Sequence, residues 1–430
     1  MVHWTNGSLI HFEMERKKVV IVGAGFAGIK LALKLDSKLF EVWVLDKLNH
    51  HQFQPLFYQV ATSQIEPSSI SFPLRNIFSG RENIMVRMAE VLEVQSENKK
   101  VITNIGDFSY DYLVLSMGCK TNFFNDEVLA KHALPLKSSY EAIAVRNHVL
   151  RSFEEVLSAS EERLKSLMNL VIVGAGPTGV ELAGAFAEIK SNILEKDYPG
   201  FDWKRLTIHL VSPNGIVLNA MSEHAQIHAK EYLQELGVNI ISNERVVSYD
   251  GKLLQFKSGL SIPCETVIWA AGVTPNTVKG FPESVELKGG RLVVDRLNKL
   301  KGVEDIFVLG DQAFMETEKY PNGHPQVANV AINQALLLAK NLRCIVNGKI
   351  PLPYEYKDLG SMATIGRNKA LVDIKNFRLK GYFAWVIWMF LHLMLILSVR
   401  NKLIIFINWA WAYFSKNTAL RLILQAERKA

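Results

Sequence analysis

An apolar run rich in β-branched residues, at 19–22, is followed by glycines and then by apolar positions spaced three and four residues apart. This pattern predicts a strand, a tight turn and a helix. A second apolar run ends at Asp46, so residues 18–46 have the length of one βαβ unit. The pattern recurs at 169–189, with a further strand predicted at 205–211. The sequence therefore predicts an α/β fold with two Rossmann-like units.

The order of the remaining predicted strands indicates how the two units are connected. Short alternating strands lie between the units, and two apolar runs that end at glycine follow the second unit. We therefore expect the second unit to be inserted within the first domain. The predicted parts are an N-terminal tail (1–16), a first domain in two pieces (17–136 and 283–355), an inserted domain (137–282) and a C-terminal region (356–430). We interpret the residues before Met14 as a tail and expect Met14 as an alternative start.

The C-terminal region contains two apolar segments, 383–399 and 403–414, flanked and separated by Lys and Arg. A membrane-spanning helix needs roughly 20 apolar residues, so the first segment is borderline and the second is too short. Tryptophan beside basic residues is typical of helices that lie in the membrane interface. We predict amphipathic helices that anchor the chain to a lipid surface, with packing in a soluble core or a dimer interface as the alternative. The tryptophans of this prediction are Trp385, Trp388, Trp409 and Trp411.

Composition excludes several classes of protein. With 49% apolar and 21% charged residues, the chain is neither disordered nor low in complexity. The formal net charge of +7 suits anionic lipids, phosphate-bearing ligands or nucleic acid, but no basic-aromatic motif supports a nucleic-acid partner. Three widely spaced cysteines, without CxxC or a His cluster, predict neither a disulfide framework nor a metal site. The N-terminus lacks the apolar stretch of a secretory signal.

The first unit carries the pattern of a dinucleotide site. Gly23, Gly25 and Gly28 follow the strand and open the helix, and Asp46 ends the second strand. The first glycine makes the turn, the second allows the backbone to approach a pyrophosphate, and the third allows close helix packing. A carboxylate at the end of the second strand can accept the hydrogen bonds of a ribose diol.

The second unit repeats the pattern with Gly174, Gly176 and Gly179. A flavin and a nicotinamide are the common pair of dinucleotides, so we predict FAD on the first domain and NAD(P)H on the inserted one. Ser212 stands where an acid for the ribose diol is expected, so NADPH is not excluded beside NADH. Glu181 lies one turn into the helix, where it either lies near the nicotinamide or stabilises the helix N-terminus by charge.

Two features near the end of the first domain add to the flavin site. Gly310 and Asp311 follow an apolar strand, where an Asp can hold ribityl hydroxyls, order a phosphate-bound water or cap a helix. A helix is predicted from about Gln326. If its N-terminus faces the flavin pyrimidine, its dipole stabilises the negative charge of the reduced flavin.

Several longer motifs occur in a family-specific order. The chain contains NHHQFQPLFYQVAT at 49–62, LVLSMGCKTNFF at 113–124, VIWAAGV at 267–273 and DLGSMATIGRNKALVDI at 358–374. Together with the glycine loops and the apolar tail, these resemble the two-dinucleotide flavoprotein disulfide-reductase superfamily. Within it, residues 17–424 resemble the type II NADH:quinone oxidoreductases.

The resemblance implies a peripheral membrane enzyme that passes a hydride from NADH to FAD and two electrons to a membrane quinone, without proton pumping. It also implies a homodimer on the cytoplasmic face of the inner membrane of a bacterium, with Glu181 as the catalytic acid. The FAD residues implied are Gly23, Gly25, Gly28, Asp46, Lys47, Gln59, Thr62, Val91, Gly118, Gly310, Asp311 and Ala328. Those for NAD(P)H are Gly174, Gly176, Gly179, Glu181 and Gly272.

The chain departs from the family's pattern beside the predicted quinone site. The family has two glutamines where this chain has Asn329 and Asn333, so each amide is one methylene shorter and the type of quinone stays open. Cys119 stands at a small-residue position and is interpreted as a packing residue. Two rival functions remain: an NAD(P)H-dependent flavoprotein reductase with a protein acceptor, and a non-catalytic NAD(P)H-responsive flavoprotein.

Overall fold

The computed structural model describes residues 15–375, 377–418 and 420–424. The predicted tail at 1–16 falls outside them except for its last two residues, and so does the alternative start Met14. Contacts divide the chain into two compact units, each of which is described by itself. The first unit comprises 1–49, 73–119 and 275–356, and the second comprises 50–72, 120–274 and 357–430.

The first unit is built on a five-stranded parallel sheet. Its strands, in spatial order, are β22 (Ile306–Val308), β9 (Tyr112–Leu115), β1 (Lys17–Val22), β2 (Phe40–Asp46) and β5 (Ile84–Met88). Val20 of β1 pairs with Trp43 on one side and with Leu113 on the other.

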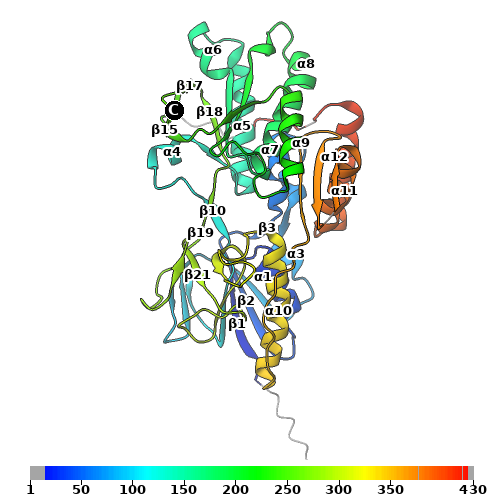
Figure 1. The fold of residues 1–430 in the computed structure, drawn as a ribbon. Helices are drawn as coiled ribbons and strands as arrows, with labels where there is room; N and C mark the ends of the chain where they lie inside the picture. The colour runs from blue at the N-terminus through cyan, green and yellow to red at the C-terminus, as the bar shows by residue number, and fades with distance from the viewer. Residues whose placement is uncertain (1–14, 376, 419, 425–430) are drawn as a thin grey trace, which may run out of the picture. The chain divides into compact units, whose positions relative to one another are not determined.

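Both faces of this sheet are buried, which explains the unbroken apolar run of β1. Val19 and Ile21 pack in a cluster with α1 (Phe26–Lys34) and α10 (Ala328–Val346). Val20 and Val22 belong to a second cluster with residues of the smaller sheets. Figure 1 shows α1 and α10 beside β1 and β2.

Two small sheets and one short helix complete the first unit. The antiparallel sheet has β6 (Val91–Gln95), β7 (Lys100–Thr103) and β8 (Gly106–Ser109), and the other has β20 (Leu287–Lys288), β21 (Arg291–Val293) and β23 (Ala313–Phe314). The short helix is α3 (Leu74–Ile77). The sheet of β6 to β8 supplies Val94 and Val101 to the second apolar cluster.

The second unit repeats the parallel sheet with different strands. In spatial order these are β11 (Leu134–Pro135), β18 (Thr266–Trp269), β12 (Asn169–Val173), β13 (Thr207–Ser212) and β14 (Asn239–Ser242). Its helices include α4 (Glu127–His132), α5 (Ser139–Val156), α6 (Glu161–Leu167), α7 (Pro177–Ile189), α8 (Glu195–Asp197) and α9 (Glu223–Glu235). The antiparallel sheet is β15 (Val246–Tyr249), β16 (Leu253–Phe256) and β17 (Ser261–Pro263). The predicted α/β class with two Rossmann-like units is confirmed.

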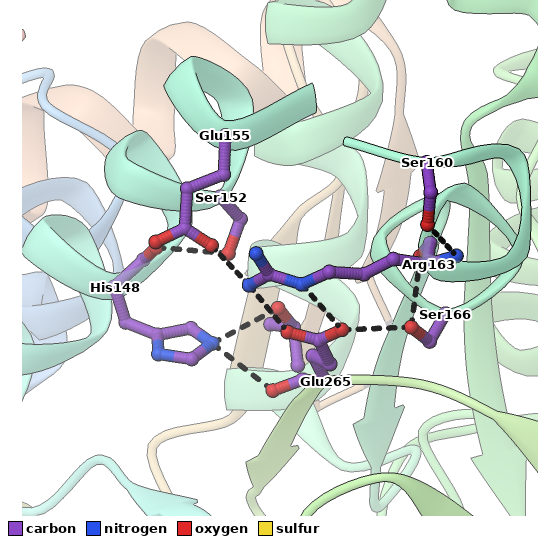
Figure 2. A network of polar contacts seen from close by, with 8 residues as sticks. His148, Ser152, Glu155, Ser160, Arg163, Ser166 and Glu265 are labelled. Carbon is purple, nitrogen blue, oxygen red and sulfur yellow. Dashed lines mark hydrogen bonds and ion pairs between the residues drawn. The ribbon is translucent and has the colours of Figure 1, made fainter. Parts of the chain in front are cut away.

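A polar network joins α5 and α6 to the start of β18 (Figure 2). The Arg163 guanidinium donates to both carboxylate oxygens of Glu265, at 3.2 and 3.0 Å, and also contacts Glu155. The Ser166 hydroxyl donates to the same Glu265 carboxylate at 2.8 Å. His148 Nε2 lies 3.1 Å from the Glu265 backbone oxygen. The bidentate geometry orients the two helices on the sheet, so this cluster has a structural role.

The C-terminal region begins with an antiparallel sheet that the sequence did not predict. Its strands are β24 (Ser361–Thr364), β25 (Ala370–Ile374) and β26 (Phe377–Lys380). The two apolar segments then form α11 (Tyr382–Leu395) and α12 (Val399–Ser415), as predicted. Among the helices of the described residues, none combines the length and the apolar character needed to cross a membrane. Contacts group the described residues of this region, from Lys357 onward, with the second unit.

Candidate functional site

The glycine loop of the first unit is shaped by close backbone contacts. Gly23 has φ +97°, and a Cβ there would lie 2.4 Å from the Ser116 carbonyl oxygen. A Cβ on Gly28 would lie 1.9 Å from the Gly23 carbonyl oxygen. A Cβ on Gly25 would meet nothing within 4 Å, so this side of the loop is open. Because α1 begins directly after it, the open side presents a helix N-terminus to a pyrophosphate.

Asp46 lies at the end of β2 and braces this loop. Its carboxylate accepts from the Ala24 N–H at 2.6 Å and from the Leu48 N–H at 2.8 Å. The predicted ribose contact would come from the same carboxylate. The neighbouring Lys47 makes an exposed ion pair with Glu90, with Nζ and Oε1 2.6 Å apart. The structure thus places both residues beside the loop.

Gly310 and Asp311 are held by amide side chains on the first unit. Gly310 has φ +66°, and its N–H donates to Oε1 of Gln334 at 2.8 Å. The Asp311 carbonyl oxygen accepts from the Gln326 amide at 3.0 Å, and the Asp311 carboxylate accepts from the Cys119 thiol at 2.8 Å. The interpretation of Cys119 as a packing residue therefore missed a polar contact. The two residues are 192 positions apart, and nothing in the sequence around Cys119 indicated that contact.

Three further residues of the flavin prediction also lie on this unit. Gly118 has φ +65° and its carbonyl oxygen accepts from the Asn276 N–H at 3.0 Å. Val91 is the first residue of β6, and Ala328 is the first residue of α10. Their roles at the flavin stay predictions.

The glycine loop of the second unit repeats the geometry of the first. Gly174 has φ +113°, and a Cβ there would lie 2.7 Å from the Ala270 carbonyl carbon. A Cβ on Gly179 would lie 1.8 Å from the Gly174 carbonyl oxygen, whereas Gly176 is open. Pro177 is the first residue of α7, a position where its missing N–H has no cost. The residues of both loops therefore fit a dinucleotide pyrophosphate.

Ser212 lies at the end of the second strand of this unit, where a side chain could hydrogen-bond the ribose hydroxyls. Its side chain is fully buried, and its hydroxyl lies 2.9 Å from the Ile216 carbonyl oxygen and 3.1 Å from Oδ1 of Asn214. It is therefore engaged by its own loop. Gly272 has φ +83°, and its carbonyl oxygen accepts from the Asn122 N–H at 3.3 Å.

Glu181 is buried on α7, and burial raises the pKa of its carboxyl well above the ordinary value. A hydrogen bond from the Thr364 backbone opposes this shift. Glu181 faces a pocket formed entirely by the second unit, between α2 (Phe57–Ala61), α7, the β24–β25 turn, α11 and α12. The acidic and aromatic residues that line it are Tyr58, Glu181, Glu188, Trp385, Trp388, Trp409 and Tyr413.

Gln59 connects α2 to α12 inside this pocket. Its buried amide accepts from the Trp409 indole N–H at 2.8 Å and donates to the Tyr58 hydroxyl at 2.9 Å. The Thr62 hydroxyl donates to the Tyr58 carbonyl oxygen at 2.8 Å at the end of α2. The sequence singled out Gln59 and Thr62, but it gave no signal for Tyr58 or for the contact with Trp409. The contact between Gln59 and Trp409 joins residues 350 positions apart in the chain.

The structure separates the four tryptophans of the membrane prediction. Trp411 is 62% exposed and Trp385 is half-buried, whereas Trp388 and Trp409 are only 1% and 7% exposed. A buried indole cannot contact lipid. The membrane role predicted for Trp388 and Trp409 is therefore wrong, because their faces of α11 and α12 pack into the second unit. For Trp385 and Trp411 it stays a prediction.

Asn329 and Asn333 lie one turn apart on α10. The Asn333 amide donates to Oδ1 of Asn329 at 2.6 Å, and both side chains are half-buried. The two shorter amides therefore bind each other along the helix. Their predicted role toward quinone stays a prediction.

Comparison with known proteins adds to this geometry. Residues 17–335 match the family model of pyridine nucleotide-disulphide oxidoreductases, and residues 359–416 match that of the NDH2 C-terminal domain. The type II NADH:quinone oxidoreductase Ndh of Mycobacterium tuberculosis is 31% identical over 93% of this chain and 89% of its own. That of Staphylococcus aureus is 29% identical over 82% of this chain and 88% of its own. The structure of NDH2 from Plasmodium falciparum in complex with NADH has a TM-score of 0.86 at 20% identity, covering 95% of this chain and 100% of that one.

Proposed function

The chain belongs to the type II NADH:quinone oxidoreductases, within the pyridine nucleotide-disulphide oxidoreductase family, and we propose that its two glycine loops divide the nucleotides between them. It is an NADH dehydrogenase that uses FAD and passes electrons to a quinone. The observation that carries the proposal is the repeated loop geometry. A Cβ on Gly25 or Gly176 would meet no atom within 4 Å, whereas a Cβ on the first or third glycine of either loop would clash with backbone.

We assign FAD to the loop of the first unit and NADH to that of the second. When bound, FAD accepts a hydride and passes two electrons onward. Asp46 would hold the loop and the ribose, and Asp311, kept in place by Cys119 and Gln326, would bind the ribityl chain. The remaining flavin contacts are assigned to Lys47, Gln59, Thr62, Val91, Gly118 and Ala328, and those of NADH to Gly272 and Glu181.

Glu181 would act as an acid beside the nicotinamide. Burial raises the pKa of its carboxyl, which makes the protonated form more accessible than in an exposed glutamate. Glu181→Gln should slow hydride transfer from NADH in a stopped-flow measurement. An unchanged rate would remove Glu181 from this step.

The outer faces of α11 and α12 support binding to a lipid surface. Phe383 and Phe414 are 74% and 83% exposed, and Phe390 and Ile407 are exposed on the same two helices. Arg400, exposed in the first turn of α12, suits anionic head groups. We propose a peripheral enzyme on the cytoplasmic face of a bacterial inner membrane.

The anchoring test must spare the buried residues of the same helices. Phe383→Ser with Phe390→Ser should reduce flotation with vesicles that contain anionic lipid, while thermal unfolding stays unchanged. Continued flotation of the double variant would contradict the assignment. We also propose a homodimer, since the family resemblance implies one; light scattering in detergent would test it.

The function itself is tested on the purified holoprotein without oxygen. NADH and, separately, NADPH are added while the flavin absorbance is followed, and a menaquinone or ubiquinone analogue is added next. Rapid bleaching that quinone reverses is expected. Bleaching that quinone cannot reverse would favour a protein acceptor or a non-catalytic NAD(P)H-responsive flavoprotein.

A further inference from the structure

A second acid lies on the pocket face of α7, two turns after Glu181. Glu188 follows it by seven residues, a spacing that places both side chains on one face of a helix. Both line the same pocket of the second unit. Glu181 is buried, whereas Glu188 is half-buried and so can reach water. The pair therefore spans the pocket from its interior toward solvent.

The Glu188 carboxylate is held by the turn between β24 and β25. Its Oε1 accepts from the Arg367 N–H at 2.5 Å, and a Cβ on Gly366 would approach the same oxygen to 2.9 Å. The Arg367 guanidinium donates to the Ala412 carbonyl oxygen at 2.8 Å and lies 5.6 Å from the Tyr413 ring centroid. Glu188 is thus positioned by backbone, and the guanidinium is engaged with α12.

The backbone around Glu188 departs from a regular helix. Directly after α7 the chain forms a π-helical turn at Lys190–Leu194, and the Asn192 amide donates to the Glu188 carbonyl oxygen at 3.0 Å. Such turns are rare and occur frequently at functional sites. This turn ends the α-helical ladder immediately beyond Glu188.

Tyr58 lies within electrostatic range of both acids. Burial raises the pKa of its hydroxyl, and the negative charges of Glu181 and Glu188 raise it further. Since the hydroxyl accepts from the Gln59 amide, its own proton remains available for an acceptor in the pocket. Glu188, Tyr58 and Glu181 are therefore three titratable groups that line one pocket.

The overall reaction has a proton requirement that these groups can meet. NADH supplies a hydride, which carries two electrons and one hydrogen, while a quinol carries two O–H groups. The balanced reaction is therefore NADH + H⁺ + quinone → NAD⁺ + quinol, and water must supply one proton for each turnover. Titratable groups in the lining of the pocket can deliver it.

We propose that Glu188 takes this proton from water at the mouth of the pocket and passes it toward Tyr58 and Glu181, with Arg367 as its positioning residue. The inference rests on the proposed function. The charged and titratable groups around Glu188 are Glu181 on α7, Tyr58 on α2, Arg367 and Lys369 at the β24–β25 turn, and Lys416 after α12. Burial raises the pKa of the Glu188 carboxyl. The hydrogen bond from the Arg367 N–H and the charges of Arg367 and Lys369 oppose this shift.

The direct test separates the two halves of the reaction in Glu188→Gln. Bleaching of the flavin by NADH should stay within about twofold of the wild type, whereas reoxidation by a quinone analogue should slow by about tenfold or more. The wild-type reoxidation rate should titrate with pH, and the variant should lose that titration. Glu195→Gln, an exposed acid beyond the π-helical turn, is the matched control and should behave as wild type.

Two further measurements keep the test decisive. Glu188→Ala should be partly rescued by acetate, because a small acid can replace the missing carboxyl. In infrared spectra of the protein without NADH or quinone, a protonated-carboxyl band that titrates should disappear in Glu188→Gln. If Glu188→Gln fails to fold, Glu188→Asp, which keeps the carboxyl, should retain a pH-dependent reoxidation.

The outcomes distinguish this inference from the proposed function. If wild-type protein is bleached by NADH and reoxidised by quinone, but Glu188→Gln has the same rates and pH profile, Glu188 is not the proton carrier. If quinone fails to reoxidise the wild type, the proposed function itself fails. An infrared band that persists in Glu188→Gln would likewise overturn the assignment.

Discussion

The indole N–H of Trp409 on α12 donates to Oε1 of Gln59 on α2 at 2.8 Å, and both side chains are buried. This bond ties the C-terminal helices to a short helix near the start of the chain. The helix with the exposed apolar side chains that we propose for a lipid surface therefore also supplies a buried polar contact to the pocket of Glu181. One helix thus has an exposed outer face and an inner face that lines the pocket.

Loss of this bond should cost stability. Trp409→Phe removes the N–H together with part of the ring volume and leaves the Gln59 oxygen buried without that donor, which should lower the free energy of unfolding by about 1–3 kcal/mol. Chemical denaturation followed by circular dichroism measures the change. Trp411→Phe is the matched control, since that residue is 62% exposed on the same helix and should change stability by less than about 0.5 kcal/mol. Equal effects would show that the bond contributes nothing.

Substitution of the crowded Gly179 and of the open Gly176 in the second loop should have different effects, the first on stability and the second on NADH binding. A Cβ on Gly179 meets the Gly174 carbonyl oxygen at 1.8 Å, so Gly179→Ala should destabilise the protein by about 2 kcal/mol or more. Gly176→Ala should leave thermal unfolding nearly unchanged but raise the Kd for NADH, because its methyl group enters the open side of the loop. Calorimetric unfolding and NADH titration test both. A normal Kd in Gly176→Ala would mean that the pyrophosphate lies elsewhere.

The stability of the second unit should fall in mild acid because of His392. Burial lowers the pKa of this imidazole from 6.5 to about 4, and Nδ1 lies 2.8 Å from the Trp388 carbonyl oxygen. Between these values the unfolded chain binds a proton that the folded chain does not. The contribution of the neutral His392 to the free energy of unfolding is therefore fully present above about pH 6.5. It is lost as the pH falls toward 4, by up to about 3 kcal/mol. His392→Phe, which keeps a ring against Trp388, should flatten this part of the pH profile of unfolding. An unaltered slope would assign the acid sensitivity to other groups.

Local pattern predicted the two nucleotide units because each depends on neighbouring residues. The strand, glycine turn and helix around Gly23 and Gly174 follow from β-branched runs, backbone approach and helix spacing within about 30 residues. The structure shows the close backbone approach at Gly23 and Gly174 that the glycine pattern predicts.

The pocket could not be predicted in the same way, because long-range contacts decide it. Hydrophobicity places Trp388, Trp409 and Trp411 equally on apolar helices, and only packing on the second unit distinguishes buried faces from exposed ones. The β24–β26 sheet was missed because residues 358–374 were interpreted as a family motif rather than as strands. The contacts of Glu188 depend on the turn at Arg367, which lies 179 residues further along the chain.

The shortened amides of α10 supply the last prediction. Asn333 and Asn329 are hydrogen-bonded to each other at 2.6 Å, so neither amide extends as far from the helix as a glutamine would. If they face the quinone, the double variant Asn329→Gln/Asn333→Gln should change the KM for a given quinone analogue by about threefold or more, while hydride transfer from NADH keeps its rate. Steady-state assays with menaquinone and ubiquinone analogues, beside stopped-flow flavin reduction, measure the two effects. Asn347→Gln, an exposed change at the far end of the same helix, should alter neither. A double variant with unchanged KM for both analogues would place the quinone away from this helix, and the departure from the family's glutamines would then have no bearing on quinone selection.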